Sequence, residues 1–102
     1  MRRREIEDLW QEHVGVPLPF SIEDYQDDEI FDLVTVDTGA AGCIQTFLSR
    51  NPPGLDPERI AVLERCAASM QQSLGWLSGE QRSYFQRLHK LSVLVLQASS
   101  GS

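Results

Sequence analysis

The stretch Asp32 to Arg50, DLVTVDTGAAGCIQTFLSR, decides the fold of this 102-residue chain. Its residues are mostly apolar or small, and after the first position it contains one acid, Asp37, ahead of the run Gly39-Ala40-Ala41-Gly42. A segment this apolar and this small has to lie at the centre of the fold, because its side chains gain most from leaving water. Its few polar groups are therefore the ones most shielded from solvent.

The apolar positions of this stretch favour a helix over roughly residues 29–49. They recur at intervals of three and four residues, as one face of a helix requires: Leu33, Val36, Ala40, Ile44 and Phe47. A short strand over residues 30–36 is the alternative, but a lone strand would have no evident partner elsewhere in the chain. The helix contains two interior glycines, each costing about 1 kcal/mol relative to alanine, which implies a packing role for them.

Similar stripes predict three more helices, over roughly residues 2–14, 57–74 and 79–97. The run Asn51-Pro52-Pro53-Gly54 interrupts the chain, and Asp56-Pro57 then supplies an N-cap with proline at the first helical position. Ser78-x-x-Gln81 matches a capping box at the start of the last helix. Four amphipathic helices with short turns predict an all-α antiparallel bundle, a single domain over residues 1–98 followed by a frayed tail at 99–102.

Composition restricts the classes of function. A chain with 41% hydrophobic and 24% charged residues has enough apolar material for one globular core. Fifteen acids against nine bases give a net charge of −6, which repels phosphate backbones and argues against a nucleic-acid partner. No apolar run approaches the ~20 residues that cross a bilayer. The two cysteines are expected to be reduced thiols of a soluble cytoplasmic protein with no membrane partner.

Three side chains raise the question of metal or thiol chemistry. Counting outward from the turns at about 1.5 Å per residue places Cys43, Cys66 and His89 near one level of the bundle. Two thiols and an imidazole at one height are a possible metal site or an activated cysteine. The favoured interpretation is structural, because buried cysteine usually behaves as a small apolar group. No cofactor or catalytic residue is assigned, and an enzyme or sensor built on these residues stays an alternative.

Asp37 is the sharper case, because it shares a helical face with apolar residues. A charged carboxylate there is costly unless it is paired. The same counting places Asp37 level with the start of the last helix, so Tyr84 or Arg82 is its predicted partner. The favoured interpretation is a buried structural hydrogen bond involving Asp37 and Tyr84, with a solvent-exposed or functional acid as alternatives.

Two pairs of acids have the spacing i, i+3 that can direct two carboxylates at one Mg²⁺ from a helix. They are Glu5 with Asp8, and Glu29 with Asp32. All-α nucleotide pyrophosphohydrolases of the MazG type use such acids, but the EExxE element of that family is absent here. A solvated helix face is therefore favoured over a Mg²⁺-dependent enzyme. His13 is interpreted as a helix-end histidine favoured by the helix dipole.

The sequence thus predicts a non-enzymatic protein-interaction module, such as an adaptor, a regulator or an immunity-type protein. Its acidic surface would suit a basic protein partner, and self-association as a homodimer is also expected. Several apolar residues fall outside or at the ends of the main stripes and are candidates for the interface: Trp10, Phe20, Phe31, Trp76 and Leu77. Gly39 and Gly42 are further candidates, because they permit close approach of another helix or of a second copy.

Overall fold

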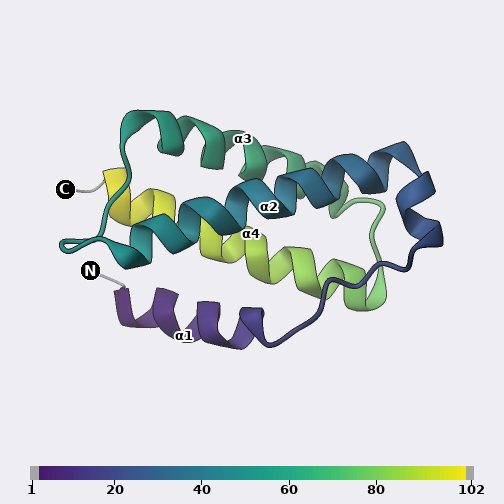
Figure 1. The fold of residues 1–102 in the computed structure, drawn as a ribbon, viewed down its shortest axis with the longest axis horizontal. Coiled ribbons are helices and arrows are strands. Elements are labelled where there is room, and N and C mark those ends of the chain that lie inside the picture. The colour runs from purple at the N-terminus through teal and green to yellow at the C-terminus, as the bar shows by residue number, and fades with distance from the viewer. Residues whose placement is uncertain (1–2, 101–102) are drawn as a thin grey trace.

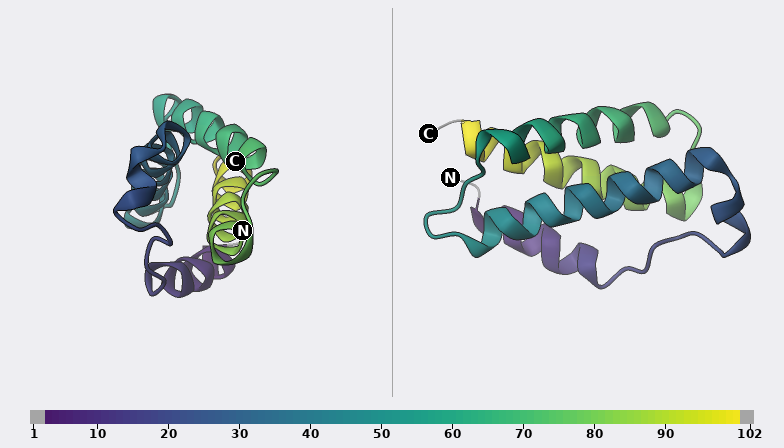
Figure 2. Two further views of the ribbon diagram at one scale, coloured as in Figure 1. Left: turned by 90° about the vertical axis from the view of Figure 1, so that its right-hand side faces the viewer. Right: turned by 45° about the horizontal axis from the view of Figure 1, so that its top comes forward.

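The computed structural model describes residues 3–100, which form four α-helices, one short 3-10 helix and no strand. In chain order these are α1 (Arg3–Val14), η1 (Glu23–Gln26), α2 (Asp28–Ser49), α3 (Pro57–Ser73) and α4 (Gly79–Ser100). The four α-helices alternate in direction, and viewed end on they surround a common core (Figures 1 and 2). The predicted all-α antiparallel bundle is confirmed. The strand alternative for residues 30–36 is wrong, because α2 runs unbroken through them.

Aspartates fix the starts of α2 and α3. Asp27 accepts hydrogen bonds through Oδ1 from the backbone N–H groups of Glu29 and Ile30, at 2.9 and 3.4 Å. Asp56 caps α3 in the same way, and Pro57 occupies the first helical position, as predicted. Both caps satisfy backbone donors that have no partner within their helix.

The start of α4 differs from the prediction. Its first residue, Gly79, has a φ of +59°, a conformation that glycine adopts without steric cost. Neither hydrogen bond of the expected capping box between Ser78 and Gln81 occurs among the described residues, and the side-chain amide of Gln81 donates to the carbonyl of Pro19 at 3.4 Å. This contact fastens the connector between α1 and η1 to α4.

The end of α4 also differs, because the helix continues to Ser100 and not to about residue 97. Leu96 and Ala98 pack against the core, so the last turn still buries apolar surface and stays helical. Residues 99 and 100, which the sequence assigned to a frayed tail, are the last two residues of this helix. Residues 101 and 102 lie outside the described residues.

The core is built from one apolar face of each helix. Helix α2 packs against α3 and α4, while α4 also packs against α3 and α1. The largest fully buried side chains come from all four helices and include Phe47, Phe85, Ile6, Ile44, Leu63, Met70, Leu88 and Leu91. None of the helices within residues 3–100 is both long and apolar enough to span a membrane.

Two of the predicted interface residues belong to this core. Trp10 is 9% exposed and Leu77 is 4% exposed. Trp10 lies one turn after Ile6 on the face of α1 that packs inward, and Leu77 returns from the turn after α3 onto the core cluster. Their assignment to an exposed interface was wrong, because Trp10 belongs to the inward stripe of α1 and the turn after α3 carries Leu77 onto the core.

Candidate functional site

A polar cluster joins three helices inside the bundle. The Tyr84 hydroxyl on α4 donates to Asp37 Oδ1 on α2 at 2.7 Å. Beside it, Arg87 Nε on α4 donates to His13 Nδ1 on α1 at 3.0 Å. The rings of His13 and Tyr84 have centroids 4.4 Å apart, so the two pairs are in contact. The cluster fastens α1 and α2 to α4.

Burial sets the protonation states within this cluster. Desolvation raises the pKa of Asp37, and the hydrogen bond from Tyr84 opposes that rise. Desolvation, helped by the charge of Arg87, lowers the pKa of His13 to about 4. The imidazole is therefore neutral at pH 7, and its Nδ1 is free to accept from Arg87. Desolvation and the neighbouring carboxylate raise the pKa of Tyr84, which keeps its proton and remains a donor.

The sequence indicated part of this cluster. Tyr84 is the partner of Asp37, whereas Arg82 donates to the backbone carbonyl of Leu74. Tyr84 is buried, but Asp37 is only half-buried. The contact of His13 with Arg87 was missed, and the one available signal was the position of His13 on the apolar stripe of its helix.

The two cysteines are free, buried thiols on α2 and α3. Desolvation raises the pKa of both, so they are protonated at neutral pH and poorly nucleophilic. Cys43 Sγ contacts the carbonyl oxygen of Arg59 at 3.7 Å. Within residues 3–100, no group of three or more His, Cys, Asp or Glu side chains is arranged to hold a metal ion. Cys43, Cys66 and His89 therefore do not form the metal site considered from sequence.

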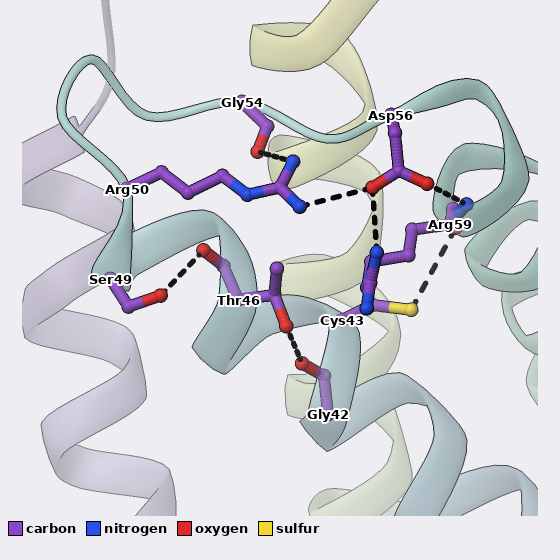
Figure 3. A network of polar contacts seen from close by, with 8 residues as sticks. All are labelled: Gly42, Cys43, Thr46, Ser49, Arg50, Gly54, Asp56 and Arg59. Atoms are coloured by element: carbon purple, nitrogen blue, oxygen red, sulfur yellow. Dashed lines mark hydrogen bonds and ion pairs between the residues drawn. The ribbon is translucent and has the colours of Figure 1, made fainter.

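A second polar network closes the loop between α2 and α3 (Figure 3). Asp56 Oδ1 accepts from Arg59 Nη1 at 2.8 Å and from Arg50 Nη2 at 3.1 Å. Arg50 also donates to the carbonyl of Gly54 at 3.3 Å. The hydrogen bond from Arg59 is the main reason why the pKa of Asp56 falls to about 2. Both arginines and Asp56 are thus tied together by hydrogen bonds, so the network stabilises the loop.

Negative charge is concentrated in the first half of the chain. Residues 5–49 contain eleven of the fifteen acids and no Lys or Arg. Six of these acids lie in η1 or around the start of α2: Glu23, Asp24, Asp27, Asp28, Glu29 and Asp32. Among the described residues, no basic side chain forms an ion pair with any of the six. This end of the bundle therefore carries uncompensated negative charge.

Exposed apolar side chains gather at the same end. Four large ones are Ile22 (86% exposed), Phe31 (58%), Trp76 (47%) and Tyr25 (38%). Helix η1 and the start of α2 lie at the end of the bundle that also holds the turn from α3 to α4, where Trp76 is located (Figures 1 and 2). Trp76, Glu29 and Asp32 line a shared groove of 320 Å³ between α2 and α3. We call residues 22–32 and Trp76 the acidic end surface.

The acid pairs considered as Mg²⁺ ligands are divided by the fold. Glu29 and Asp32 belong to the acidic end surface, whereas Glu5 and Asp8 line a shallow groove along α1 with Lys90. Neither pair gains a third acidic, thiol or imidazole ligand from the part of the chain that the structure describes. All four carboxylates lie at exposed positions of their helices.

The remaining interface candidates have different surroundings. Phe20 is half-buried, and its ring centroid lies 5.9 Å from that of Phe85. Gly39 packs inside the bundle, since a Cβ there would meet Cys66 Sγ at 3.3 Å. Gly42 is exposed on α2 with no atom within 4 Å of such a Cβ. Gly39 therefore serves the contact of α2 with α3, and Gly42 leaves the outer face of α2 open.

No protein-family model matches this chain, and comparisons with curated proteins and with solved structures find no similar protein. The acidic end surface combines negative charge without ion pairs with exposed apolar area, whereas in the buried polar cluster Tyr84 is paired with Asp37 and Arg87 Nε with His13.

Proposed function

We propose that this protein is a non-enzymatic interaction module that binds a basic segment of another protein through the acidic end surface. The observation that carries the proposal is the coincidence of six acids without ion pairs and four exposed large apolar side chains at one end of the bundle. Exposed apolar groups rimmed by charge are typical of protein interfaces. Aromatic residues such as Trp76 and Tyr25 commonly supply the binding energy in such surfaces.

The chemistry of the surface supports a basic partner. Unpaired carboxylates attract Lys and Arg side chains, accelerate encounter and disfavour acidic competitors. The exposed ring of Trp76, beside Glu29 and Asp32, offers a cation–π contact to one basic side chain of the partner. The matching ligand is an amphipathic segment that presents basic residues together with aliphatic ones. An adaptor, a regulator or an immunity-type protein would use such a surface.

A fluorescence titration tests this proposal. Trp76 is exposed and Trp10 is buried, so a Trp10→Phe variant reports on Trp76 alone. A synthetic helical peptide of Lys and Leu should shift the Trp76 emission to shorter wavelength in a saturable manner, because binding removes the ring from water. The matched peptide with Glu in place of Lys should have no effect. Absence of a shift with the basic peptide, or equal shifts with both peptides, would contradict the proposal.

Self-association through the outer face of α2 is the second part of the proposal. That face carries no charge at its exposed positions Thr35, Thr38, Gly42 and Gln45. The hydroxyls of both threonines donate to the carbonyls four residues earlier, at 3.2 Å, so their polar hydrogens are already satisfied. Two copies with a charge of −6 each repel least where they meet through uncharged surface. Gly42 would permit close approach of the two helices.

Light scattering across a concentration series tests the self-association. The wild-type protein is expected to form a dimer, and Gly42→Glu should return it to the monomer by placing a charge in the contact. Gln71→Glu, at an exposed position on α3, is the control and should leave the dimer intact. A wild-type monomer at all concentrations would refute this part and leave the partner-binding proposal standing.

The two free thiols support a reducing compartment such as the cytoplasm as the place of action.

A further inference from the structure

A groove of 620 Å³ lies between the connector that follows α1 and the first turns of α4, away from the groove that Trp76 lines. Its walls include Val16, Pro17 and Pro19 from the connector and Ser83, Tyr84 and Arg87 from α4. The connector is held in place by the hydrogen bond of Gln81 to the Pro19 carbonyl and by the stacking of Phe20 on Phe85. The groove is therefore formed in the folded protein and has the size of a small-molecule site.

Arg87 gives this groove its chemical character. Its Nε is committed to His13, but no hydrogen bond of Nη1 or Nη2 and no ion pair of this residue occurs among the described residues. By contrast, Arg50 and Arg59 share the carboxylate of Asp56. Arg87 is half-buried, so its charge is less screened than that of an exposed base. A guanidinium in this state is suited to a carboxylate, which it can bind through two parallel hydrogen bonds.

The other lining residues define the rest of the ligand. Val16, Pro17 and Pro19 present apolar surface without side-chain hydrogen-bonding groups, and Ser83 supplies an exposed hydroxyl beside Arg87. Glu80 lies two helical turns before Arg87, about 10 Å along α4, and also borders the groove. A second negative charge on the ligand would meet Glu80 and be disfavoured. We infer that this groove binds a small monocarboxylate with an apolar body, whose carboxylate contacts Arg87. The inference does not depend on the proposed protein partner.

The probe is 4-phenylbutyrate, with the neutral 4-phenylbutanol as its matched control. Both are titrated into ¹⁵N-labelled wild-type protein while backbone amide shifts are followed by NMR. The acid should produce saturable shifts centred on residues 79–87 and 16–19, and the alcohol should bind at least about tenfold more weakly, since it lacks the charge that Arg87 recognises. Equal binding of acid and alcohol, shifts centred on other residues, or no shift with the acid would overturn the inference.

Two variants separate the role of Arg87 from its contribution to the fold. Arg87→Gln keeps a donor for His13 and should weaken binding of the acid at least about tenfold. If that variant does not fold, Ser83→Glu tests whether the acid binds in this groove. It places a negative charge in the groove at an exposed position and should weaken binding of the acid to a similar extent. Glu80→Gln removes the opposing charge and should bind the acid as tightly as wild type or more so. Unchanged affinity in Ser83→Glu, or weaker binding in Glu80→Gln, would count against the site.

Discussion

The hydroxyl of Tyr84 donates a 2.7 Å hydrogen bond to Asp37 Oδ1 and so joins the fourth helix to the second. Tyr84→Phe removes the only donor that the structure gives to this half-buried carboxylate among the described residues. We expect a loss of about 1–3 kcal/mol in the free energy of unfolding, the usual cost of leaving a buried polar group without its partner. Urea denaturation at pH 7 measures it, and an unchanged midpoint would show that water replaces the hydroxyl.

Asp37→Asn should behave differently, because the pKa of Asp37 is raised in the folded protein. The folded state then binds the proton more tightly than the unfolded state, so ionisation of Asp37 lowers stability as pH rises through its folded pKa. Asparagine keeps an acceptor for Tyr84 without the charge. At pH 7 the variant should be as stable as wild type or more stable, and the difference should shrink at pH 3. A loss as large as that of Tyr84→Phe would show that the charge itself is stabilising.

His13 should dominate the loss of stability in mild acid. Its pKa falls from an ordinary 6.5 to about 4 on folding, so its contribution is complete above pH 6.5 and is lost as pH falls through 4. We expect a decrease of about 2 kcal/mol in unfolding free energy from this residue over that interval. His13→Gln, which can still accept from Arg87, should flatten the profile measured by urea denaturation. The control is His89→Gln, since burial also lowers the pKa of His89; an equal flattening in both variants would contradict the assignment.

The two glycines of α2 should respond oppositely to alanine. Gly42 has open space around it, so Gly42→Ala should raise monomer stability by about 1 kcal/mol through helix propensity. At Gly39 the new methyl group meets Cys66 Sγ at 3.3 Å, and this contact should cancel the same gain. The double variant Gly39→Ala, Cys66→Ala removes the sulfur and should gain relative to Cys66→Ala alone. Thermal unfolding under dilute, monomeric conditions measures the stability of each variant. A gain in stability for Gly39→Ala alone would show that α3 shifts to admit the methyl group without an energetic penalty.

The fold was largely predictable because its signals are local. The periodic apolar positions of α2 and the proline after Asp56 determine where helices run and begin. The pairing of Asp37 with Tyr84 followed from counting residues along antiparallel helices with short turns. The same counting does not extend to α1, because the connector over residues 15–27 is long. A long connector does not determine which residues of α1 lie at the same height in the bundle as residues of the other helices. The contact of His13 with Arg87, 74 residues away, was therefore outside its reach.

The surface was less predictable, because exposure at the end of a helix depends on how the next turn folds. Trp76 and Leu77 are neighbours with similar sequence context, yet one is exposed and the other is buried. Likewise, the acids of residues 23–32 are evident in the sequence, but their lack of ion pairs among the described residues depends on which helices pack beside them. Only the assembled bundle places these acids at the same end as Phe31 and Trp76.

Two charge-neutralised variants of equal net charge test most directly whether the acidic end surface binds a basic partner. The first, Asp28→Asn, Glu29→Gln, Asp32→Asn, alters the acidic end surface; the second, Glu5→Gln, Asp8→Asn, Glu12→Gln, alters exposed acids of α1. The measurement is the Kd of the Lys and Leu peptide at one fixed salt concentration. We predict that the first variant binds at least about tenfold more weakly than wild type, while the second changes little. Equal weakening in both variants would show that only net charge matters and would contradict a specific binding surface.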